Sequence, residues 1–222
     1  RERDKQSRMA VLPTAAGQTA MAPDGTTRST GSGEPGLVVA VFSPKGGVGR
    51  TTVAVNLAIA AAQELGKKVV IMDASFQFGD VGVLLNLNPK SKSIADLIPE
   101  LETGTLDSLD TFLINHTAGI SVLLAPPSPE TAEMITASGV KVILEALKRD
   151  HDLVVVDCTS YFNDTTLAVL DAADCILTML RPEITSIKNM RPFLEVREPP
   201  GSHNGTQPPA PHPREPAGPP AL

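Results

Sequence analysis

The sequence predicts an α/β fold in which a mostly parallel sheet is covered by helices on both faces. Short runs rich in β-branched residues alternate with segments of helical period along the chain, and this alternation is typical of a parallel sheet. The runs are apolar without interruption, as in strands that are buried on both faces. With 222 residues, of which 41% are hydrophobic, the chain is long enough for one domain with a substantial core.

Strands and helices are expected in the central part of the chain. The predicted strands cover residues 37–43, 68–73, 120–125, 152–157 and 175–180. The predicted helices cover residues 50–65, 79–86, 93–102, 106–114, 130–149 (broken near Gly139), 163–171 and 183–196. Ligands of parallel sheets bind beyond the carboxyl ends of the strands, which is where Lys45, Asp73 and Asp157 fall.

Composition divides the chain into a folded part, residues 37–196, and two flanking segments. Residues 1–36 are rich in small and charged residues without a period, so we expect a disordered linker. Residues 197–222 contain nine of the 20 prolines, so we expect a disordered proline-rich tail. A start at Arg1 favours a fragment of a longer protein, and the change of composition after Val196 fits either a misjoined reading frame or an authentic tail.

Charge and apolar content narrow the classes of function. Residues 37–196 carry 12 basic against 19 acidic residues, which disfavours binding to a nucleic-acid backbone. No apolar run is long enough for a membrane span or a signal peptide, so we expect a cytoplasmic protein. Cys158 and Cys175 lack the spacing of a metal site, and we expect both to be reduced, buried packing residues.

A glycine-rich loop, VFSPKGGVGRTT at residues 41–52, joins the first strand to the first helix. Gly46, Gly47 and Gly49 lack the Cβ atom that would block the approach of phosphate oxygens to backbone N–H groups. Helix 50–65 would point its positive end at the same anion. The loop therefore predicts a phosphate site, with a strand-to-helix turn that binds no ligand as the alternative.

The loop departs from the strict Walker A pattern, G-x-x-x-x-G-K-[ST]. Pro44 stands at the position of its first glycine and Arg50 at the position of its lysine. Thr51 keeps the hydroxyl group that would bind Mg²⁺ beside the phosphates. Arg50 keeps the positive charge, but its planar head is larger than an ammonium group, so we expect nucleotide binding of reduced affinity.

The stretch KGGVGRTT, led by Lys45, resembles the deviant Walker A loop of the ParA/MinD ATPases, and the resemblance covers residues 37–196. The segments VFSPKGGVGRTTVAVNLA and VVIMDASFQFGDVGVLLNL are most similar to the CpaE/TadZ-like branch, which helps to assemble and localise Tad-type pili. The resemblance implies a three-layer P-loop NTPase fold that binds ATP and Mg²⁺. It also implies an ATP-dependent homodimer in which Lys45 reaches the phosphates of the other subunit, like an arginine finger supplied in trans.

The same resemblance implies roles for individual residues. The implied nucleotide-binding residues are Lys45, Gly46, Gly47, Val48, Gly49, Arg50, Thr51 and Thr52. The implied catalytic residues are Lys45, Asp73 and Ser75, and the implied Mg²⁺ ligands are Thr51, Asp73 and Asp157. Carboxylates at these positions suit a hard cation, although aspartates at strand ends are also common as turn formers or helix caps. Gln77 and Asp80 lie in the loop that follows Asp73, which resembles a switch loop of the family. A solvated loop in which these two residues have no function is an equally good interpretation.

Two further departures from the family pattern limit the expected activity. Ser75 replaces the second aspartate of the D-x-D switch, which positions the attacking water, so we expect weak or absent ATP hydrolysis. After Val196 the chain lacks the further strand with an adenine-recognising asparagine and the closing helices of the family. We therefore expect a sheet that is truncated at its C-terminal edge and exposes apolar surface there.

These inferences favour an ATP-binding dimeric switch or scaffold in the localisation and assembly of Tad-type pili. The alternatives are an active partition-type ATPase that positions DNA or protein cargo, and a non-functional truncated fragment. The expected partners are pilus-assembly or polar-localisation proteins, which would also supply any recruitment to the membrane or cell pole. Direct membrane insertion is not expected, because residues 197–222 cannot form an amphipathic helix.

Overall fold

The computed structural model describes residues 35–88, 91–103, 106 and 108–197 of the chain. All of them belong to the second of two units, Gly33–Leu222. The predicted linker and the predicted proline-rich tail lie outside the described residues, except for residues 35, 36 and 197. Among the described helices, none is both long and apolar enough to cross a membrane.

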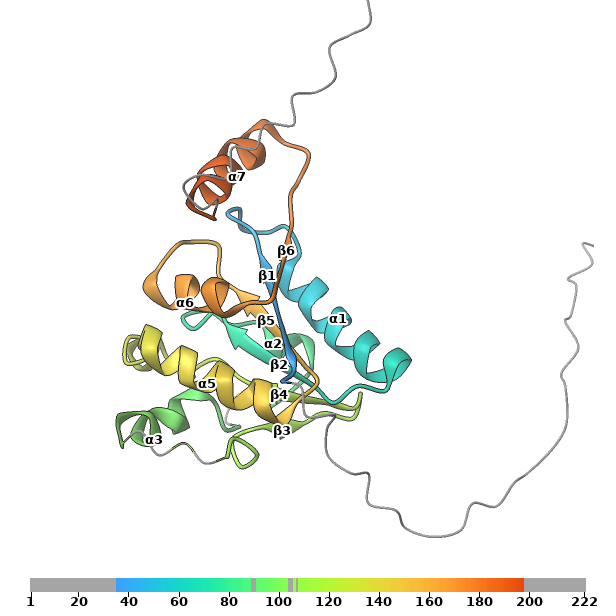
Figure 1. Cartoon of the computed structure of the whole chain (residues 1–222), viewed down its shortest axis with the longest axis vertical. Coiled ribbons are helices and arrows are strands. Elements are labelled where there is room, and N and C mark those ends of the chain that lie inside the picture. The colour runs from blue at the N-terminus through green and yellow to red at the C-terminus, as the bar shows by residue number, and fades with distance from the viewer. Residues whose placement is uncertain (1–34, 89–90, 104–105, 107, 198–222) are drawn as a thin grey trace, which may run out of the picture. The chain divides into compact units, whose positions relative to one another are not determined.

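A six-stranded sheet forms the centre of the described part (Figure 1). Its strands are β1 (Leu37–Phe42), β2 (Val69–Ala74), β3 (Ile114–Asn115), β4 (Ile120–Leu123), β5 (Leu153–Cys158) and β6 (Cys175–Thr178). They lie in the order β3-β4-β2-β5-β1-β6, and every neighbouring pair is parallel except β3 with β4. The predicted mostly parallel sheet is therefore confirmed.

Helices cover both faces of the sheet, as predicted (Figure 1). One face carries α1 (Arg50–Leu65) and α2 (Val81–Leu84). The other face packs against η1 (Ile94–Leu97), α3 (Ile98–Thr103), α4 (Pro129–Ala132), α5 (Ala137–Asp150), α6 (Asp164–Ala172) and α7 (Ile184–Arg197).

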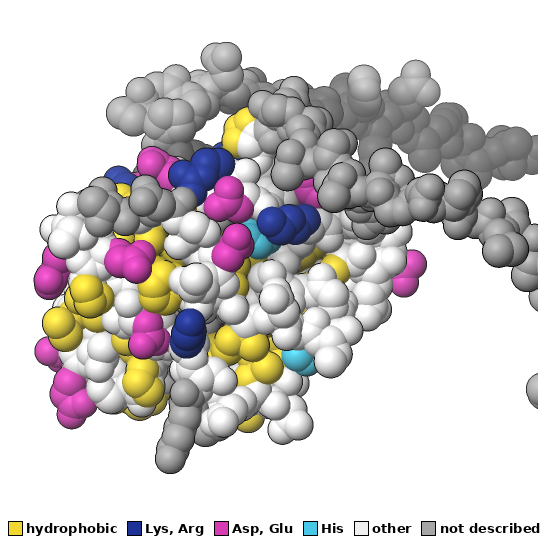
Figure 2. Space-filling view, turned by 90° about the horizontal axis from the view of Figure 1, so that it is seen from below, with side chains coloured by type: hydrophobic (Ala, Val, Ile, Leu, Met, Phe, Trp, Pro, Cys, Tyr) yellow, Lys and Arg dark blue, Asp and Glu magenta, His cyan; other side chains and the backbone are white. Residues whose placement is uncertain are grey.

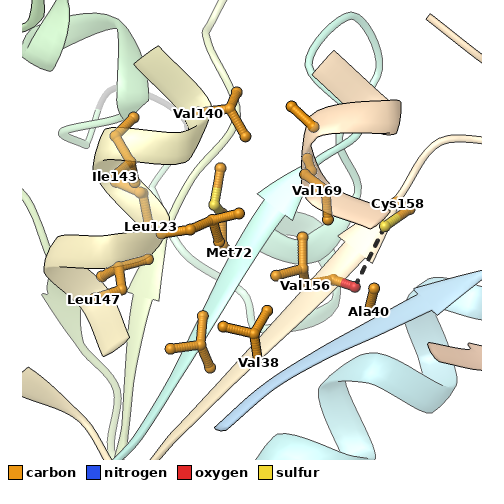
Figure 3. Close-up of a cluster of buried hydrophobic side chains, with 14 of the residues drawn as sticks. Val38, Ala40, Met72, Leu123, Val140, Ile143, Leu147, Val156, Cys158 and Val169 are labelled. Atoms are coloured by element: carbon orange, nitrogen blue, oxygen red, sulfur yellow. Dashed lines mark hydrogen bonds between the residues drawn. The ribbon is translucent and has the colours of Figure 1, made fainter. Parts of the chain in front are cut away.

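The alternation of side chains along the central strands creates two separate cores. Met72 and Val156 point toward α5 and α6 (Figure 3), whereas Ile71 and Val155 pack on the side of α1. All four side chains are 0% exposed, and complete burial of one such side chain stabilises the fold by about 2 kcal/mol. The central strands are thus anchored on both faces and form a rigid platform for their loops.

Two predicted helices differ from the structure. The described part of residues 106–114 forms a turn that leads into β3, so the predicted helix is wrong. The predicted helix 130–149 is divided into α4 and α5 at residues 133–136, upstream of Gly139. The division has a local cause, because the Thr136 side chain caps α5 by accepting a hydrogen bond from the Gly139 N–H at 3.1 Å.

The two cysteines lie in different environments. Cys158 is 1% exposed within the core on the α5 side (Figure 3), as predicted. Cys175 is exposed on β6, so the prediction that it is buried is wrong. Both are free thiols. The exposure of Cys175 follows from its strand, because β6 pairs with β1 and, within the described residues, with no strand on its other side.

Charged side chains of both signs share the face that Figure 2 shows, seen from below in the orientation of Figure 1. Lys and Arg side chains lie there among Asp and Glu side chains and between apolar patches. On this face the described residues do not form the continuous basic surface that a nucleic-acid backbone requires.

Candidate functional site

The glycine loop at residues 43–49 follows β1 and leads directly into α1. Gly47 and Gly49 have φ angles of 71° and 87°, a conformation that residues with a Cβ rarely adopt. Gly46 has no such angle, and a Cβ atom built on it would meet no atom within 4 Å. The backbone therefore requires glycine at two of these positions, while the space beside Gly46 is open to a ligand.

The N-terminus of α1 faces this loop without a side-chain cap. Its N-cap residue is Gly49, and the first turn contains no acidic residue. Val48 is half-buried in the loop, and Thr52 is exposed in the first turn. The first N–H groups of a helix have no partner within the helix, and the helix dipole adds partial positive charge there. This arrangement can bind an anion such as a phosphate.

Arg50 and Lys45 make different contacts. Arg50 Nη1 donates a hydrogen bond to the carbonyl oxygen of Ser43 at 3.3 Å, which holds the guanidinium against the backbone of the loop. A guanidinium has five N–H donors, so this bond leaves others for a phosphate. The Lys45 backbone N–H donates to Ser43 Oγ at 3.2 Å, but the Lys45 ammonium group has no hydrogen-bond or ion-pair partner in the described part of the chain.

Asp73 and Asp157 lie side by side in register near the carboxyl ends of β2 and β5. Both residues are 1% exposed. Burial, reinforced by the negative charge of Asp157, raises the pKa of Asp73 to about 7. Burial raises the pKa of Asp157 to about 6, although a hydrogen bond with Thr51 and the charge of Arg50 lower it. Two buried carboxyl groups at paired positions of neighbouring strands favour a bound cation, because a cation would stabilise both as carboxylates.

Asp157 and Thr51 suit a hard cation such as Mg²⁺. Asp157 Oδ1 is buried and has no hydrogen-bond partner among the described residues, and the Thr51 side chain interacts with the same carboxyl group. Carboxylate and hydroxyl oxygens are ligands that Mg²⁺ accepts, alongside water and substrate phosphates. No group of three or more His, Cys, Asp and Glu side chains in the described residues could hold a metal ion. A cation here would therefore need phosphate and water oxygens as further ligands.

The raised pKa values predict how stability depends on pH without nucleotide. Between about pH 4 and pH 7 the folded state binds more protons at Asp73 and Asp157 than the unfolded state, whose aspartates titrate near 3.8. Their contribution to stability is therefore largest below about pH 4, and it is lost as the pH rises to about 7. We expect Asp157→Asn to raise the free energy of unfolding at pH 8 by about 1–3 kcal/mol, measured by urea denaturation.

The comparison of wild type with Asp157→Asn isolates this effect from other titrating groups. Burial lowers the pKa of His151, so that residue destabilises the fold as the pH falls below about 6.5 in both proteins. The difference between the two proteins should shrink toward zero near pH 4. A difference that is equally large at pH 5 and pH 8 would contradict the raised pKa of Asp157.

The switch-like loop after β2 is organised around Asp73. The N–H groups of Ser75 and Val81 donate to its two carboxyl oxygens, each at 3.1 Å. A Cβ atom at Gly79 would overlap the same carboxyl group, which explains a glycine at this position. Ser75 Oγ donates to the carbonyl oxygen of Phe78 at 3.3 Å. Asp73 therefore holds the backbone of this loop in place, and the Ser75 hydroxyl forms its hydrogen bond within the same loop.

Two predicted residues remain, Asp80 and Gln77. Two further residues, Ser43 and Tyr161, bond to predicted site residues although the sequence analysis does not select them. Asp80 is exposed, and its charge raises the pKa of both Asp73 and Asp157. Gln77 turns away to the loop after β5, where the Tyr161 hydroxyl donates to Gln77 Oε1 at 3.2 Å. Ser43 accepts hydrogen bonds from Lys45 and Arg50, and its position at the end of the first predicted strand, next to the glycine loop, indicates such a role. Nothing in the sequence near Tyr161 indicates its hydrogen bond to Gln77.

Comparisons with known proteins identify relatives of this chain. A family model described as an AAA domain matches residues 36–198. The antiactivator FleN of Pseudomonas aeruginosa is 33% identical over 174 residues, which cover 76% of this chain and 59% of FleN. A ParA family ATPase from Chlorobium tepidum has a TM-score of 0.65 at 25% identity, covering 72% of this chain and 67% of that protein. The septum site-determining protein MinD from Pyrococcus horikoshii, complexed with Mg-ADP, has a TM-score of 0.62 at 19% identity, covering 72% and 64%.

These similarities confirm the predicted three-layer P-loop NTPase fold of the described residues. They concern part of each relative: the chain spans 59% of the length of FleN and 58% and 55% of two further curated relatives.

Proposed function

This chain belongs to the AAA-domain family of ParA/MinD-type P-loop ATPases, and on that premise we propose that it binds Mg·ATP and acts as a nucleotide-dependent dimeric switch or scaffold. One observation carries the proposal. An uncapped helix N-terminus and a glycine loop stand beside a buried carboxylate, Asp157, whose Oδ1 atom lacks a partner among the described residues. MinD of Pyrococcus horikoshii, which shares the fold, is complexed with Mg-ADP.

The groups of the site would act on different parts of the nucleotide. The loop N–H groups and the Arg50 guanidinium would donate hydrogen bonds to phosphate oxygens. Thr51 and Asp157 would hold Mg²⁺, with Asp73 beside them, and the bound ion would neutralise charge on the phosphates. The Lys45 ammonium group, which has no partner within the described chain, would reach the phosphates of a second subunit.

We propose that hydrolysis is weak because of Ser75. Alignment of an attacking water needs a group that accepts its proton or orients it strongly. The Ser75 hydroxyl is neutral and donates its hydrogen bond to the Phe78 carbonyl oxygen at 3.3 Å. A protein of this kind would keep the ATP-bound dimer for a long time, which suits a scaffold better than a rapidly cycling enzyme.

The proposed cellular role is the localisation and assembly of Tad-type pili through protein partners. Its support is the resemblance of the loop and switch segments to the CpaE/TadZ-like branch. The similarity to FleN, an antiactivator, supports a regulatory role for this chain. A partition-type ATPase that positions DNA would instead bind DNA with a strong dependence on salt. DNA binding that weakens steeply between low and physiological salt would replace the pilus proposal with that alternative.

Gly46→Ala tests whether the loop binds phosphates. The added Cβ meets no atom within 4 Å, and Gly46 has no positive φ angle, so the free energy of unfolding should change by less than about 0.5 kcal/mol. A methyl group in the space next to the loop N–H groups should nevertheless weaken ATP binding at least roughly tenfold, or about 1.4 kcal/mol. Isothermal titration with Mg·ATP measures the affinity, and urea denaturation measures stability.

Gly66→Ala is the matched control. Gly66 lies at the C-terminal end of α1, the end away from the glycine loop, and has a φ angle of 61°. Alanine there should destabilise the fold by about 1–2 kcal/mol. Its ATP affinity should equal that of wild type. If Gly46→Ala binds ATP as tightly as wild type does, phosphates do not occupy the loop and the proposed function fails.

A further inference from the structure

A pocket of about 260 Å³ opens at the carboxyl ends of β2 and β5. Its floor is apolar and includes Phe76 and Ile135, which are 7% and 5% exposed. Its rim is polar and includes Gln77, Glu133, Tyr161 and Asp164. A site with an apolar floor and a few polar groups at its mouth has the general character of a binding site.

The pocket lies on the opposite face of the sheet from the candidate nucleotide site. Asp73 and Asp157 alternate with Ala74 and Cys158 along β2 and β5, and the latter two belong to the core on the α5 and α6 side. Successive side chains of a strand point to opposite faces. Ala74 lines the pocket, so the two sites share the loops that follow these strands but not their side chains.

The charge at the rim of the pocket is negative. Glu133 and Asp164 supply carboxylates, and no Lys or Arg side chain of the described residues lines the pocket. Neither carboxylate forms an ion pair within the described part of the chain. Asp164 lies in the first turn of α6, where negative charge stabilises a helix. Glu133 follows the C-terminus of α4, where negative charge gives no such benefit.

Tyr161 adds an aromatic group to the rim. Its hydroxyl donates to Gln77 Oε1 at 3.2 Å, which joins the loops after β2 and β5 across the pocket. The residue is 47% exposed, so its ring is accessible to a ligand. An arginine side chain matches this set of groups, because its stem packs on apolar surface while its guanidinium stacks on aromatic rings and binds carboxylates.

We propose that this pocket binds an arginine side chain of a protein partner. Charge complementarity identifies the ligand, because the pocket offers two unpaired carboxylates and the folded part of the chain has an excess of acidic residues. The proposal does not depend on nucleotide binding, because the pocket contains none of the loop residues 43–52.

The only tyrosine of the chain reports on the pocket directly. The sequence contains one Tyr and no Trp, so the tyrosine emission of the full chain arises from Tyr161 alone. The probe is the blocked peptide acetyl-Gly-Arg-Gly-amide, titrated into the full chain in the millimolar range expected of so small a ligand. The same peptide with citrulline, the neutral isostere of arginine, is the second probe. We expect saturable change of the Tyr161 emission with the arginine peptide and at least roughly tenfold weaker binding of the citrulline peptide.

Variants at the rim assign the binding to its carboxylates. Glu133→Gln and Asp164→Asn should each weaken the arginine peptide roughly threefold or more, and the double variant roughly tenfold or more. Glu130→Gln is the matched control, because Glu130 is exposed one turn away on α4 and does not line the pocket. It should change the affinity by less than about twofold.

Three results would overturn the proposal. One is the absence of saturable change in Tyr161 emission with the arginine peptide. Another is equal binding of the arginine and citrulline peptides, which would make the pocket a site for neutral groups. The third is a loss of affinity in Glu130→Gln as large as that in Glu133→Gln, which would reduce the effect to general attraction between charges. Thermal unfolding of each variant verifies that it is folded at the temperature of the titration.

Discussion

Ser75→Asp is expected to raise the rate of ATP hydrolysis by roughly 10²-fold to 10⁴-fold, the range typical of a positioned acid–base group. The aspartate would restore the group that orients the attacking water in the family that the loop resembles. ATP affinity should change little, because the hydrogen bonds of Ser75 join it to Asp73 and Phe78 within the loop after β2. Phosphate release under single-turnover and steady-state conditions measures the rate.

Ser75→Ala separates the loss of the serine from the gain of the aspartate. It removes the hydrogen bond to the Phe78 carbonyl oxygen, and hydrolysis should remain as slow as in wild type. Arg50→Lys tests the competing explanation, in which the larger guanidinium misplaces the γ-phosphate. If Arg50→Lys restores turnover while Ser75→Asp gains nothing, the arginine is the cause of slow hydrolysis and the proposed role of Ser75 is wrong.

Lys45→Ala is expected to weaken ATP-dependent dimerisation roughly 30-fold or more, as the loss of one partner from a buried charge pair typically does. ATP binding by the monomer should be largely kept, because the Lys45 ammonium group has no partner within the described chain. The free energy of unfolding should stay the same for that reason. Sedimentation equilibrium at several protein concentrations in Mg·ATP gives the dissociation constant of the dimer.

Lys67→Ala is the control for the charge that Lys45→Ala removes. Lys67 is exposed beyond the C-terminal end of α1, the end of this helix away from the glycine loop. Its replacement should leave the dimer constant unchanged. Equal dimerisation of wild type and Lys45→Ala would contradict the trans role of Lys45.

Local signals in the sequence were sufficient for several elements of the fold. Helix α1 covers residues 50–65 as predicted, because glycines in the left-handed conformation stand at both of its ends, Gly49 and Gly66. The central strands were predicted within one or two residues at most ends, because both of their faces are buried and their runs are apolar throughout. Signals of this kind depend on neighbours in the chain alone.

The segment 106–114 shows where such signals fail. Leu106, Leu109 and Leu113 have the spacing of a helix face, yet Leu109 packs against the core from a turn and Leu113 from the residue before β3. Leu109 is 1% exposed, so the apolar residue was correctly expected inside. Tertiary packing, which a periodic pattern does not report, determined the backbone conformation.

The candidate site was likewise predictable only in part. Composition and position predicted that Asp73 and Asp157 lie at strand ends, but their direct pairing depends on the strand order, which brings β2 next to β5. The hydrogen bond between Tyr161 and Gln77 joins residues 84 positions apart. The hydroxyl of Ser75 bonds to Phe78 because of the path of one loop. Contacts of these kinds become visible only when the strands and loops have been placed in space.

Sedimentation velocity of the full chain with Mg·ATP and with ATP plus EDTA tests the central claim most directly. The proposed switch predicts a monomer in EDTA and a species of about twice that mass in Mg·ATP at the same protein concentration, because dimerisation needs both the nucleotide and the cation held by Thr51 and Asp157. Absorbance of the nucleotide in the moving boundary confirms that ATP is bound. A boundary that carries ATP but sediments as the monomer does would contradict the account.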